Sequence, residues 1–213
     1  SSDLEFLMDG RVIDAPWPIR CMIVKGFILP FRPKKSAHAY QSIWTPDGSP
    51  LIVMGRRLRE LVAPKVSCPV ELCMRYQNPT PGSVLERLRQ QGVNRVILFP
   101  LFPHYAMSSY ESALEEVRRC AAKDFQDLEL RVCPPYYAHP SYIGALTRSI
   151  QPSLENQWDH LLISFHGIPE RHLRKSDPTH GHCLGTKTCC DTPSPAHAFC
   201  YRQDRKSTRL NSS

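Results

Sequence analysis

The sequence contains no hydrophobic run long enough to span a membrane, and it shows no secretory signal. It also lacks short internal repeats and low-complexity stretches. What remains is a chain of 213 residues, of which 41% are hydrophobic, and this is ordinary for a globular protein. The length suits one domain, or one domain and part of a second.

Acidic residues are the scarcer charged type, with 20 Asp and Glu against 27 Lys and Arg, for a net charge of +7. Part of the excess lies in residues 204–213, which match the translation of a common DNA sequencing adapter. We therefore expect the natural sequence to stop at Gln203 and residues 204–213 to be a non-native read-through tail. Without that tail the net charge is +5. This modest excess favours an anionic substrate or a membrane surface over nucleic acid, although a solvated basic surface accounts for most of the charges.

Helical and strand patterns alternate along the chain from residue 50 onward. Short apolar runs predict strands near residues 70–74, 96–101, 128–133 and 159–165. Helices are predicted between them, and two begin at capping boxes, Ser83 with Glu86 and Ser108 with Glu111. Such alternation is typical of an α/β protein with a parallel sheet and helices on both faces.

The most informative stretch runs from His160 to His172. Leu161 to Phe165 resembles a buried strand, and His166 follows it, before a glycine that permits a sharp turn. Ligands of open parallel sheets lie outside the carboxyl ends of the strands, so an imidazole at this place is well positioned to take part in catalysis. On position alone, a histidine that only caps the strand through a backbone hydrogen bond is an equal alternative.

The residues Ser-Phe-His-Gly-Ile-Pro-Glu-Arg, from Ser164 to Arg171, resemble the signature of the ferrochelatase family. Ferrochelatases insert Fe²⁺ into protoporphyrin IX to form protohaem, the last step of haem biosynthesis, and have two similar flavodoxin-like α/β domains. The resemblance implies that residues 1–150 form the N-terminal chelatase-like domain, with an incomplete start. Residues 151–203 would begin the second α/β domain, including a cysteine-rich segment, with most of that domain missing.

Further matches to the family identify four candidate porphyrin-binding residues: Arg32, Ser49 in Gly-Ser-Pro, Arg75 in Arg-Tyr, and Tyr105. An arginine such as Arg32 suits a propionate because the guanidinium is a planar, two-pronged donor, although a solvated basic turn is the alternative. Ser49 is also the expected N-cap of a helix beginning at Pro50, and a helix start favours an anion. For Arg75 the alternative is an ion pair with a structural carboxylate.

Metal insertion requires two pyrrole N–H protons to leave, and a neutral imidazole accepts a proton at cellular pH. The resemblance assigns His166 as the proton acceptor or the metal-delivering residue. In the family this histidine is paired with a glutamate of the C-terminal domain, and residues 1–203 offer no candidate for it. We therefore expect residues 1–203 alone to be inactive.

Two other functions are considered. A cobalt chelatase acting on a sirohydrochlorin-type ring has a related fold and cleft histidines, but the Gly-Ser-Pro, Arg-Tyr and four-cysteine features argue against it. The second is a non-catalytic module that binds an iron–sulfur cluster or zinc. Such a module would keep the cysteines but would not insert a metal into a porphyrin.

Four of the nine cysteines, Cys183, Cys189, Cys190 and Cys200, lie in a stretch with few large apolar residues. Such a stretch cannot build a core of its own, and a bound metal would order it. Four thiolates fit a structural zinc or a [2Fe–2S] cluster, and adjacent cysteines fit a single zinc poorly. A subset of bacterial ferrochelatases carries a [2Fe–2S] cluster on a similar segment that also ends in Cys-Tyr-Arg, so the resemblance implies the cluster.

Zinc and free thiols are the alternatives at this segment. In the zinc case His180, His182 and His197 are available as further ligands. The other five cysteines lie among apolar residues and are expected to be small buried side chains: Cys21, Cys68, Cys73, Cys120 and Cys133.

Residues 15–32 form the most apolar long segment, but it is too short and too interrupted to span a bilayer. The resemblance places this segment at the lip of the porphyrin cleft. It implies a cytoplasmic protein that contacts the inner membrane peripherally through the same residues. An amphipathic helix packed on the core is the alternative.

Overall fold

The computed structural model describes residues 2–30, 40–155 and 158–207. Arg32, one of the candidate porphyrin-binding residues, lies outside these ranges. The chain divides into two compact units. Unit 1 comprises Ser1–Val96 and Ser112–Arg131, and unit 2 comprises Ile97–Glu111 and Val132–Ser213.

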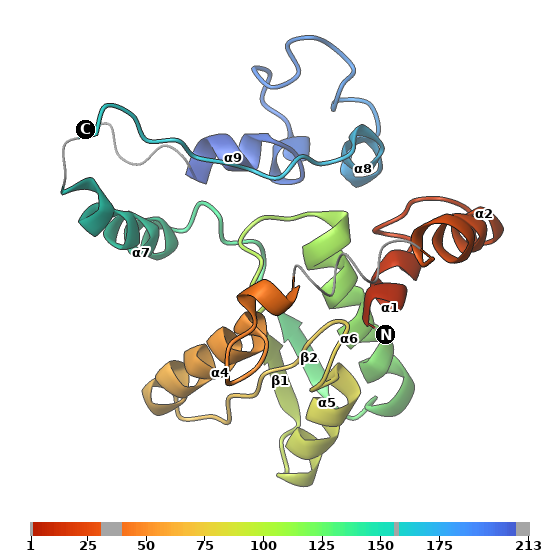
Figure 1. Ribbon diagram of the computed structural model, residues 1–213, viewed down its shortest axis with the longest axis vertical. Coiled ribbons are helices and arrows are strands. Elements are labelled where there is room, and N and C mark those ends of the chain that lie inside the picture. The colour runs from red at the N-terminus through yellow and green to blue at the C-terminus, as the bar shows by residue number, and fades with distance from the viewer. Residues whose placement is uncertain (1, 31–39, 156–157, 208–213) are drawn as a thin grey trace. The chain divides into compact units, whose positions relative to one another are not determined.

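Unit 1 is mainly helical (Figure 1). Its helical elements are α1 (Ser2–Met8), α2 (Trp17–Cys21), the π-helical segment η1 (Met22–Ile28), α4 (Pro50–Val62), the 3-10 segment η2 (Ala63–Lys65), α5 (Pro81–Gln90) and α6 (Ser112–Asp124). Ser49 occupies the N-cap position of α4, as predicted, with Pro50 as the first helical residue. The Ser49 side chain makes no capping hydrogen bond.

The core of unit 1 lies where α5 packs on α6. Helix α5 begins at Pro81, earlier than the predicted Ser83, because the Thr80 side chain accepts a hydrogen bond from the Ser83 amide at 3.3 Å and caps the helix there. Gly92 follows α5 with φ of 77°, the left-handed conformation predicted for the residue after the helix. Seven apolar side chains of this core are buried: Val84, Leu85, Leu88, Leu114, Val117, Ala121 and Phe125.

Two of the predicted strands are formed, β1 (Arg95–Leu98) and β2 (Glu129–Val132). The Glu129 amide donates to the Asn94 carbonyl at 2.8 Å, and the Cys133 amide donates to the Leu98 carbonyl at 2.9 Å. Because donor and acceptor advance in the same direction, the strands are parallel, and they run side by side in Figure 1. The predicted α/β class, with a parallel sheet and flanking helices, is confirmed.

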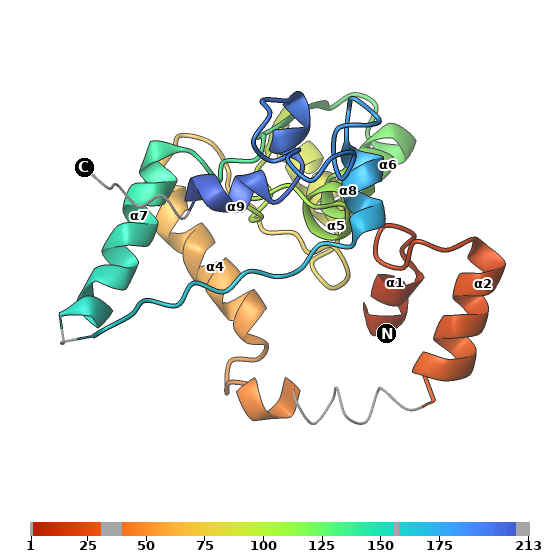
Figure 2. The same ribbon diagram turned by 90° about the horizontal axis from the view of Figure 1, so that it is seen from above.

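The strands predicted at 70–74 and 159–165 are not formed. Residues 159–165 run as an extended trace toward α8 (Glu170–Ser176) in Figure 2. Leu162 was expected inside the sheet and is 92% exposed. The reason is that a strand needs a neighbour to satisfy its backbone hydrogen bonds, and in the described part of the chain β1 and β2 pair only with each other.

Unit 2 is built from short helices and loops. Its elements are η3 (Met107–Glu111), α7 (Pro140–Ile150), the 3-10 segment η4 (Gln151–Leu154), α8, the 3-10 segment η5 (Pro195–Ala198) and α9 (Arg202–Ser207). Leu173 of α8 forms a buried cluster with Cys183, Ala196 and Cys200, and Ile168 packs against it. The cysteine-rich segment therefore gains its core by packing on α8.

The cysteines outside this segment are less buried than expected. Cys68 is exposed, and it lies in the irregular stretch between η2 and α5. The others, Cys21, Cys73, Cys120 and Cys133, are half-buried. The prediction of five buried thiols is therefore wrong, most clearly for Cys68.

Candidate functional site

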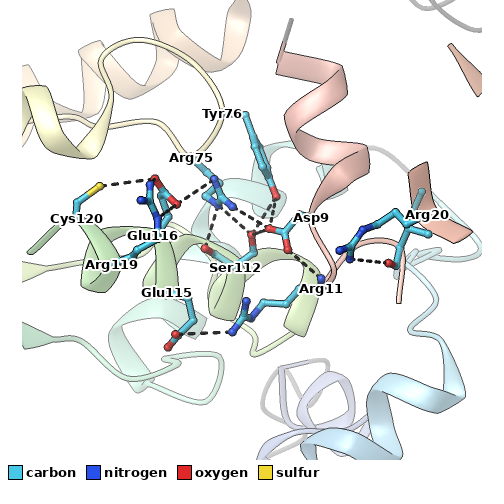
Figure 3. Close-up of polar contacts among 11 residues, drawn as sticks. Asp9, Arg11, Arg20, Arg75, Tyr76, Ser112, Glu115, Glu116, Arg119 and Cys120 are labelled. Atoms are coloured by element: carbon cyan, nitrogen blue, oxygen red, sulfur yellow. Dashed lines mark hydrogen bonds and ion pairs between the residues drawn. The ribbon is translucent and has the colours of Figure 1, made fainter. Parts of the chain in front are cut away.

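Asp9 is the centre of a polar network in unit 1 (Figure 3). It follows α1, and its carboxylate lies 2.9 Å from the Arg75 guanidinium and accepts a hydrogen bond from the Tyr76 hydroxyl at 3.1 Å. The Ser112 hydroxyl at the start of α6 also donates to this carboxylate. Arg75 in turn donates from Nε to both oxygens of Ser112 at 3.0 Å. One carboxylate thus connects α1, the stretch before α5, and α6.

The electrostatics of this network favour an ionised Asp9. Burial alone would raise the pKa of Asp9, but hydrogen bonds from Ser112, the Arg11 amide and Tyr76, with the charge of Arg75, outweigh burial and lower it. Arg75 has a second carboxylate, Glu116, at 3.7 Å. The structure therefore shows Arg75 engaged in ion pairs within its own unit, which is the arrangement of the structural alternative considered for it.

A cavity of about 590 Å³ borders this network in unit 1. Asp9, Arg75, Tyr76, Glu116 and Arg119 all contribute to its wall. Arg75 therefore faces both its carboxylate partners and an open space. Asp9 and Glu116 were not singled out from the sequence, because they contact Arg75 across large sequence separations that leave no local pattern.

His166 is exposed in unit 2. Its Nδ1 lies 2.7 Å from the carbonyl oxygen of Gly167. A carbonyl oxygen only accepts, so Nδ1 carries the hydrogen and Nε2 of the neutral ring holds the lone pair. The ring is thus oriented with its proton-accepting nitrogen away from the backbone.

The stretch after His166 is held by the cysteine-rich segment. The Tyr201 hydroxyl accepts a hydrogen bond from the Ile168 amide at 2.9 Å and donates one to the Ile168 carbonyl at 2.6 Å. Ile168 also packs on the cluster that contains Cys183 and Cys200. Both the main chain and the side chain of Ile168 are therefore fixed by this segment.

Tyr105 is held by the same segment. Its amide donates to Oε1 of Gln203 at 2.7 Å, and Nε2 of Gln203 donates back to the Tyr105 carbonyl at 3.2 Å. The Phe199 ring contacts the Tyr105 ring edge-on, with centroids 4.8 Å apart. The Tyr105 hydroxyl donates to Glu111 and accepts from Ser176 at 3.4 Å. The structure thus brings Tyr105 next to the end of the cysteine-rich segment, a contact that the sequence did not indicate.

The beginning of the cysteine-rich segment is organised by Asp177, which is 1% exposed. Its carboxylate accepts hydrogen bonds from the amides of Thr179, His182 and Cys183 at 2.7–2.8 Å, and from the Thr179 hydroxyl at 2.6 Å. Burial would raise the pKa of Asp177, but these four donors lower it far below its usual value. The loop that carries Cys183 is therefore folded around an ionised carboxylate.

The backbone of the same loop is sterically constrained. His180 and Leu184 have φ of 59° and 61°, a left-handed conformation that is unusual for residues other than glycine. The backbone at Gly185 approaches the Gly181 carbonyl so closely that no Cβ would fit. The backbone path between Asp177 and Gly185 is thus defined by sterics as well as by hydrogen bonds.

The four thiols of the segment interact with one another. Burial raises the pKa of Cys183 to about 12, with further contributions from the Cys200 thiol, the Asp177 carboxylate and Cys189. Burial and the Cys189 thiol likewise raise the pKa of Cys190. The described side chains nevertheless include no group of three or more His, Cys, Asp or Glu placed to hold a metal ion. The donor chemistry fits a metal, and the sulfurs would have to move closer together to bind one.

Two histidines of the segment make hydrogen bonds to the same backbone carbonyl. Nε2 of His182 and Nε2 of His197 lie 2.8 Å and 3.2 Å from the Cys189 carbonyl oxygen. Their rings meet edge-on with centroids 5.3 Å apart. Because a carbonyl only accepts, both Nε2 atoms carry hydrogen, and the lone pair of each neutral ring is on Nδ1.

A parallel sheet with flanking helices defines a protein of the α/β class. The ferrochelatase family model matches residues 4–204, and the chain belongs to the ferrochelatase family. The predicted family is confirmed.

Curated relatives carry the same family name. The chain is 52% identical over 200 residues to the ferrochelatase of Azotobacter vinelandii, and 49% and 51% identical over 200 residues to those of Stutzerimonas stutzeri and Ectopseudomonas mendocina. Each comparison covers 93% of this chain. The chain spans 58–59% of the length of these relatives.

Proposed function

We propose that the full-length protein inserts Fe²⁺ into protoporphyrin IX and releases two protons as protohaem forms. The observation that carries this proposal is the ferrochelatase family match over residues 4–204, supported by relatives that bear that name. The activity belongs to the whole protein, because the chain spans 58–59% of those relatives, and residues 1–203 alone are inactive in this proposal. Residues 1–150 would be the N-terminal domain and residues 151–203 the beginning of the second.

His166 is the proposed proton acceptor or metal-delivering residue. The hydrogen bond from Nδ1 to the Gly167 carbonyl supports the role of proton acceptor, because it leaves the lone pair of the ring on Nε2. Only two of the four ring nitrogens carry a proton, and each of these two loses its proton as its bond to Fe²⁺ forms. The exposed imidazole would take up that proton and release it to water before the next transfer.

The porphyrin would be bound through Arg32, Ser49, Arg75 and Tyr105. Ser49 at the start of α4 supports an anion contact, since the first amides of a helix have no partner within it. Arg75 borders a cavity, which supports substrate contact, whereas its ion pair with Asp9 supports a structural role. Arg32 rests on the family resemblance alone.

A [2Fe–2S] cluster on Cys183, Cys189, Cys190 and Cys200 is the proposed cofactor, with structural zinc as the alternative. Cys183 and Cys200 belong to one buried cluster, which supports a common site for at least these two thiols. A cluster there would cross-link the segment and could supply one-electron chemistry.

Contact with the inner membrane through residues 15–32, on the cytoplasmic side, is a further part of the proposal. Among the described residues no helix is long and apolar enough to cross a membrane. In α2 and η1, Val24 is fully buried while Trp17 and Phe27 are 65% and 68% exposed. This segment has one buried face and one exposed face. The large apolar side chains on the exposed face point away from the core, which supports contact with a membrane surface.

The first test is an absorption spectrum with iron, zinc and sulfide analysis of the full-length protein purified without oxygen, followed by a porphyrin metalation assay. Metalation with Fe²⁺ that is lost in His166→Ala, at unchanged metal content, supports the proposal. A protein that holds its cluster and shows no metalation would be a non-catalytic module. A preference for Co²⁺ and a sirohydrochlorin-type ring would identify the other chelatase class.

A further inference from the structure

One peptide group, formed by the Gly167 carbonyl and the Ile168 amide, connects Tyr201 to His166. Its N–H donates a hydrogen bond to the Tyr201 hydroxyl at 2.9 Å. Its carbonyl oxygen accepts a hydrogen bond from Nδ1 of His166 at 2.7 Å. Because a peptide bond is planar, these two hydrogen bonds lie at the two ends of one rigid group. A contact that fixes the N–H therefore also fixes the direction of the carbonyl.

Steric contacts at Gly167 do not fix this peptide plane. Glycine restricts the backbone least, and a Cβ added at position 167 would meet no atom within 4 Å. The preceding residues, 158–166, form neither helix nor strand. In the part of the chain that the structure describes, the orientation of the plane therefore depends on what holds Ile168.

Ile168 is held by Tyr201 and by packing. The Tyr201 hydroxyl accepts from the Ile168 amide and donates to the Ile168 carbonyl at 2.6 Å, so it binds both main-chain groups of this residue. Pro169 follows with φ of −59°, and α8 begins directly after it. The Ile168 side chain packs against the buried cluster of Leu173. Ile168 is thus a fixed point from which the peptide plane is oriented.

The hydrogen bonds form a continuous series from the imidazole to Tyr201. Nδ1 of His166 donates to the Gly167 carbonyl, the Ile168 amide of the same peptide group donates to the Tyr201 hydroxyl, and that hydroxyl donates to the Ile168 carbonyl. A peptide group whose N–H donates has a more strongly accepting carbonyl, so the Tyr201 contact strengthens the bond from His166. None of these bonds involves a cysteine, and none requires a metal.

We propose that Tyr201 sets the tautomer of His166 through this peptide group. By aiming the Gly167 carbonyl at Nδ1, it keeps the hydrogen of the neutral ring on Nδ1 and the lone pair on Nε2. If the carbonyl turned away, the hydrogen would be free to occupy either nitrogen, and fewer molecules would offer a lone pair on Nε2. The inference rests on the proposed function for the role of Nε2 as proton acceptor. Tyr201 acts through the main chain of other residues, so it is a positioning residue.

Heteronuclear NMR of the imidazole nitrogens in the full-length protein, labelled at histidine, reports the His166 tautomer without substrate. Spectra are recorded at alkaline pH, where imidazole rings are neutral, and His166→Gln identifies the signals of His166 by their absence. The wild-type ring should carry its hydrogen on Nδ1. Tyr201→Phe removes only a hydroxyl from a side chain at a position that is 40% exposed, so the fold should persist and His166 should become a mixture of both tautomers.

Amide exchange and kinetics provide two further readouts. Tyr201→Phe should speed hydrogen exchange of the Ile168 amide roughly tenfold, because the acceptor of that amide is gone. Its kcat for porphyrin metalation should fall severalfold at unchanged KM, since no proposed porphyrin contact is altered. The matched control is Tyr142→Phe in α7, because the hydroxyl of Tyr142 makes no hydrogen bond in the described part of the chain. This control should leave the tautomer, the exchange and kcat unchanged.

Two results would overturn the proposal: a wild-type ring with its hydrogen on Nε2, or a His166 tautomer that is the same in wild type and in Tyr201→Phe. The first is measured on the wild-type protein and does not depend on how well the variant folds. The proposed function fails by a different result, the absence of porphyrin metalation by the wild-type protein. Because the tautomer is measured without substrate, the two failures are distinguishable.

Discussion

The Asp9 carboxylate and the Arg75 guanidinium lie 2.9 Å apart, with 6% and 22% of their side chains exposed. The pair joins α1 to the stretch before α5, and Ser112 extends it to α6. Removing water from a charge pair is costly, so the pair is stabilising only while both partners and their hydrogen bonds are present. The first two predictions follow from this dependence.

Asp9→Asn should lower stability at neutral pH and lose its effect in acid. The pKa of Asp9 is lowered in the folded protein, so the stability that its charge contributes is present above the unfolded pKa of about 3.9 and is lost as pH falls through the folded pKa. Urea unfolding of the full-length protein from pH 7 to pH 3 measures this. The difference between wild type and variant should be largest near pH 7. The exposed Asp127→Asn provides the control, and a difference that grows in acid would contradict the assignment.

Arg75→Met should destabilise the full-length protein by about 1–3 kcal/mol, because it leaves the Asp9 charge buried without its cation. The double variant with Asp9→Asn should be less destabilised than the sum of the two single variants. Urea unfolding measures the loss of stability in each of the two single variants and in the double variant. Additive effects would show that the pair is not coupled, and a rise in porphyrin KM at unchanged stability would assign Arg75 to the substrate alone.

Asp177→Asn should expose the Cys183 thiol. The amide group replaces an acceptor oxygen with a donor that faces backbone N–H groups, so the loop around residues 177–183 should open. Alkylation rates measured by mass spectrometry in the metal-free, reduced protein should rise severalfold at Cys183 and stay constant at Cys68. Asp191→Asn, an exposed carboxylate in the same segment, is the control. Equal acceleration at every cysteine would indicate general unfolding instead.

Gln203→Ala should lower the free energy of unfolding of the full-length protein by about 1–3 kcal/mol, because it removes the two hydrogen bonds between Gln203 and the Tyr105 main chain. Gln126→Ala, at an exposed position after α6, should change it by less than about 0.5 kcal/mol. Urea unfolding monitored by circular dichroism compares the two. Equal effects would show that the Gln203 hydrogen bonds do not contribute to stability.

Local signals in the sequence predicted two helix ends and two strands, whereas neither predicted capping box, at Ser83 or Ser108, begins an α-helix. Pro50 after Ser49, and Gly92 after α5, lie at the helix ends where their backbone preferences place them. The two strands that pair with each other, β1 and β2, are at their predicted places. The stretches 70–74 and 159–165 have equally apolar sequences, but an apolar run becomes a strand only beside a neighbour, and no local pattern specifies that neighbour.

The contacts around the candidate site were the least predictable part. His166 and the four cysteines could be found from the sequence because each belongs to a compact motif. The bonds from Tyr201 to Ile168 and from Gln203 to Tyr105 span 33 and 98 residues, and one tyrosine or glutamine in a loop carries no sign of its partner. Asp177 was also missed, although Asp-Pro-Thr before a glycine is a typical turn sequence in which a carboxylate binds nearby amides.

The close approach of Gly185 to the Gly181 carbonyl has a consequence for mutational tolerance. Even alanine at position 185 would force the backbone apart and alter the path between Cys183 and Cys189. By contrast, Lys187 is exposed and its side chain extends from the same loop without such a constraint. In a library that substitutes every residue of this segment, position 185 should accept glycine alone while position 187 varies freely, so the pattern of permitted substitutions would trace the loop's backbone path.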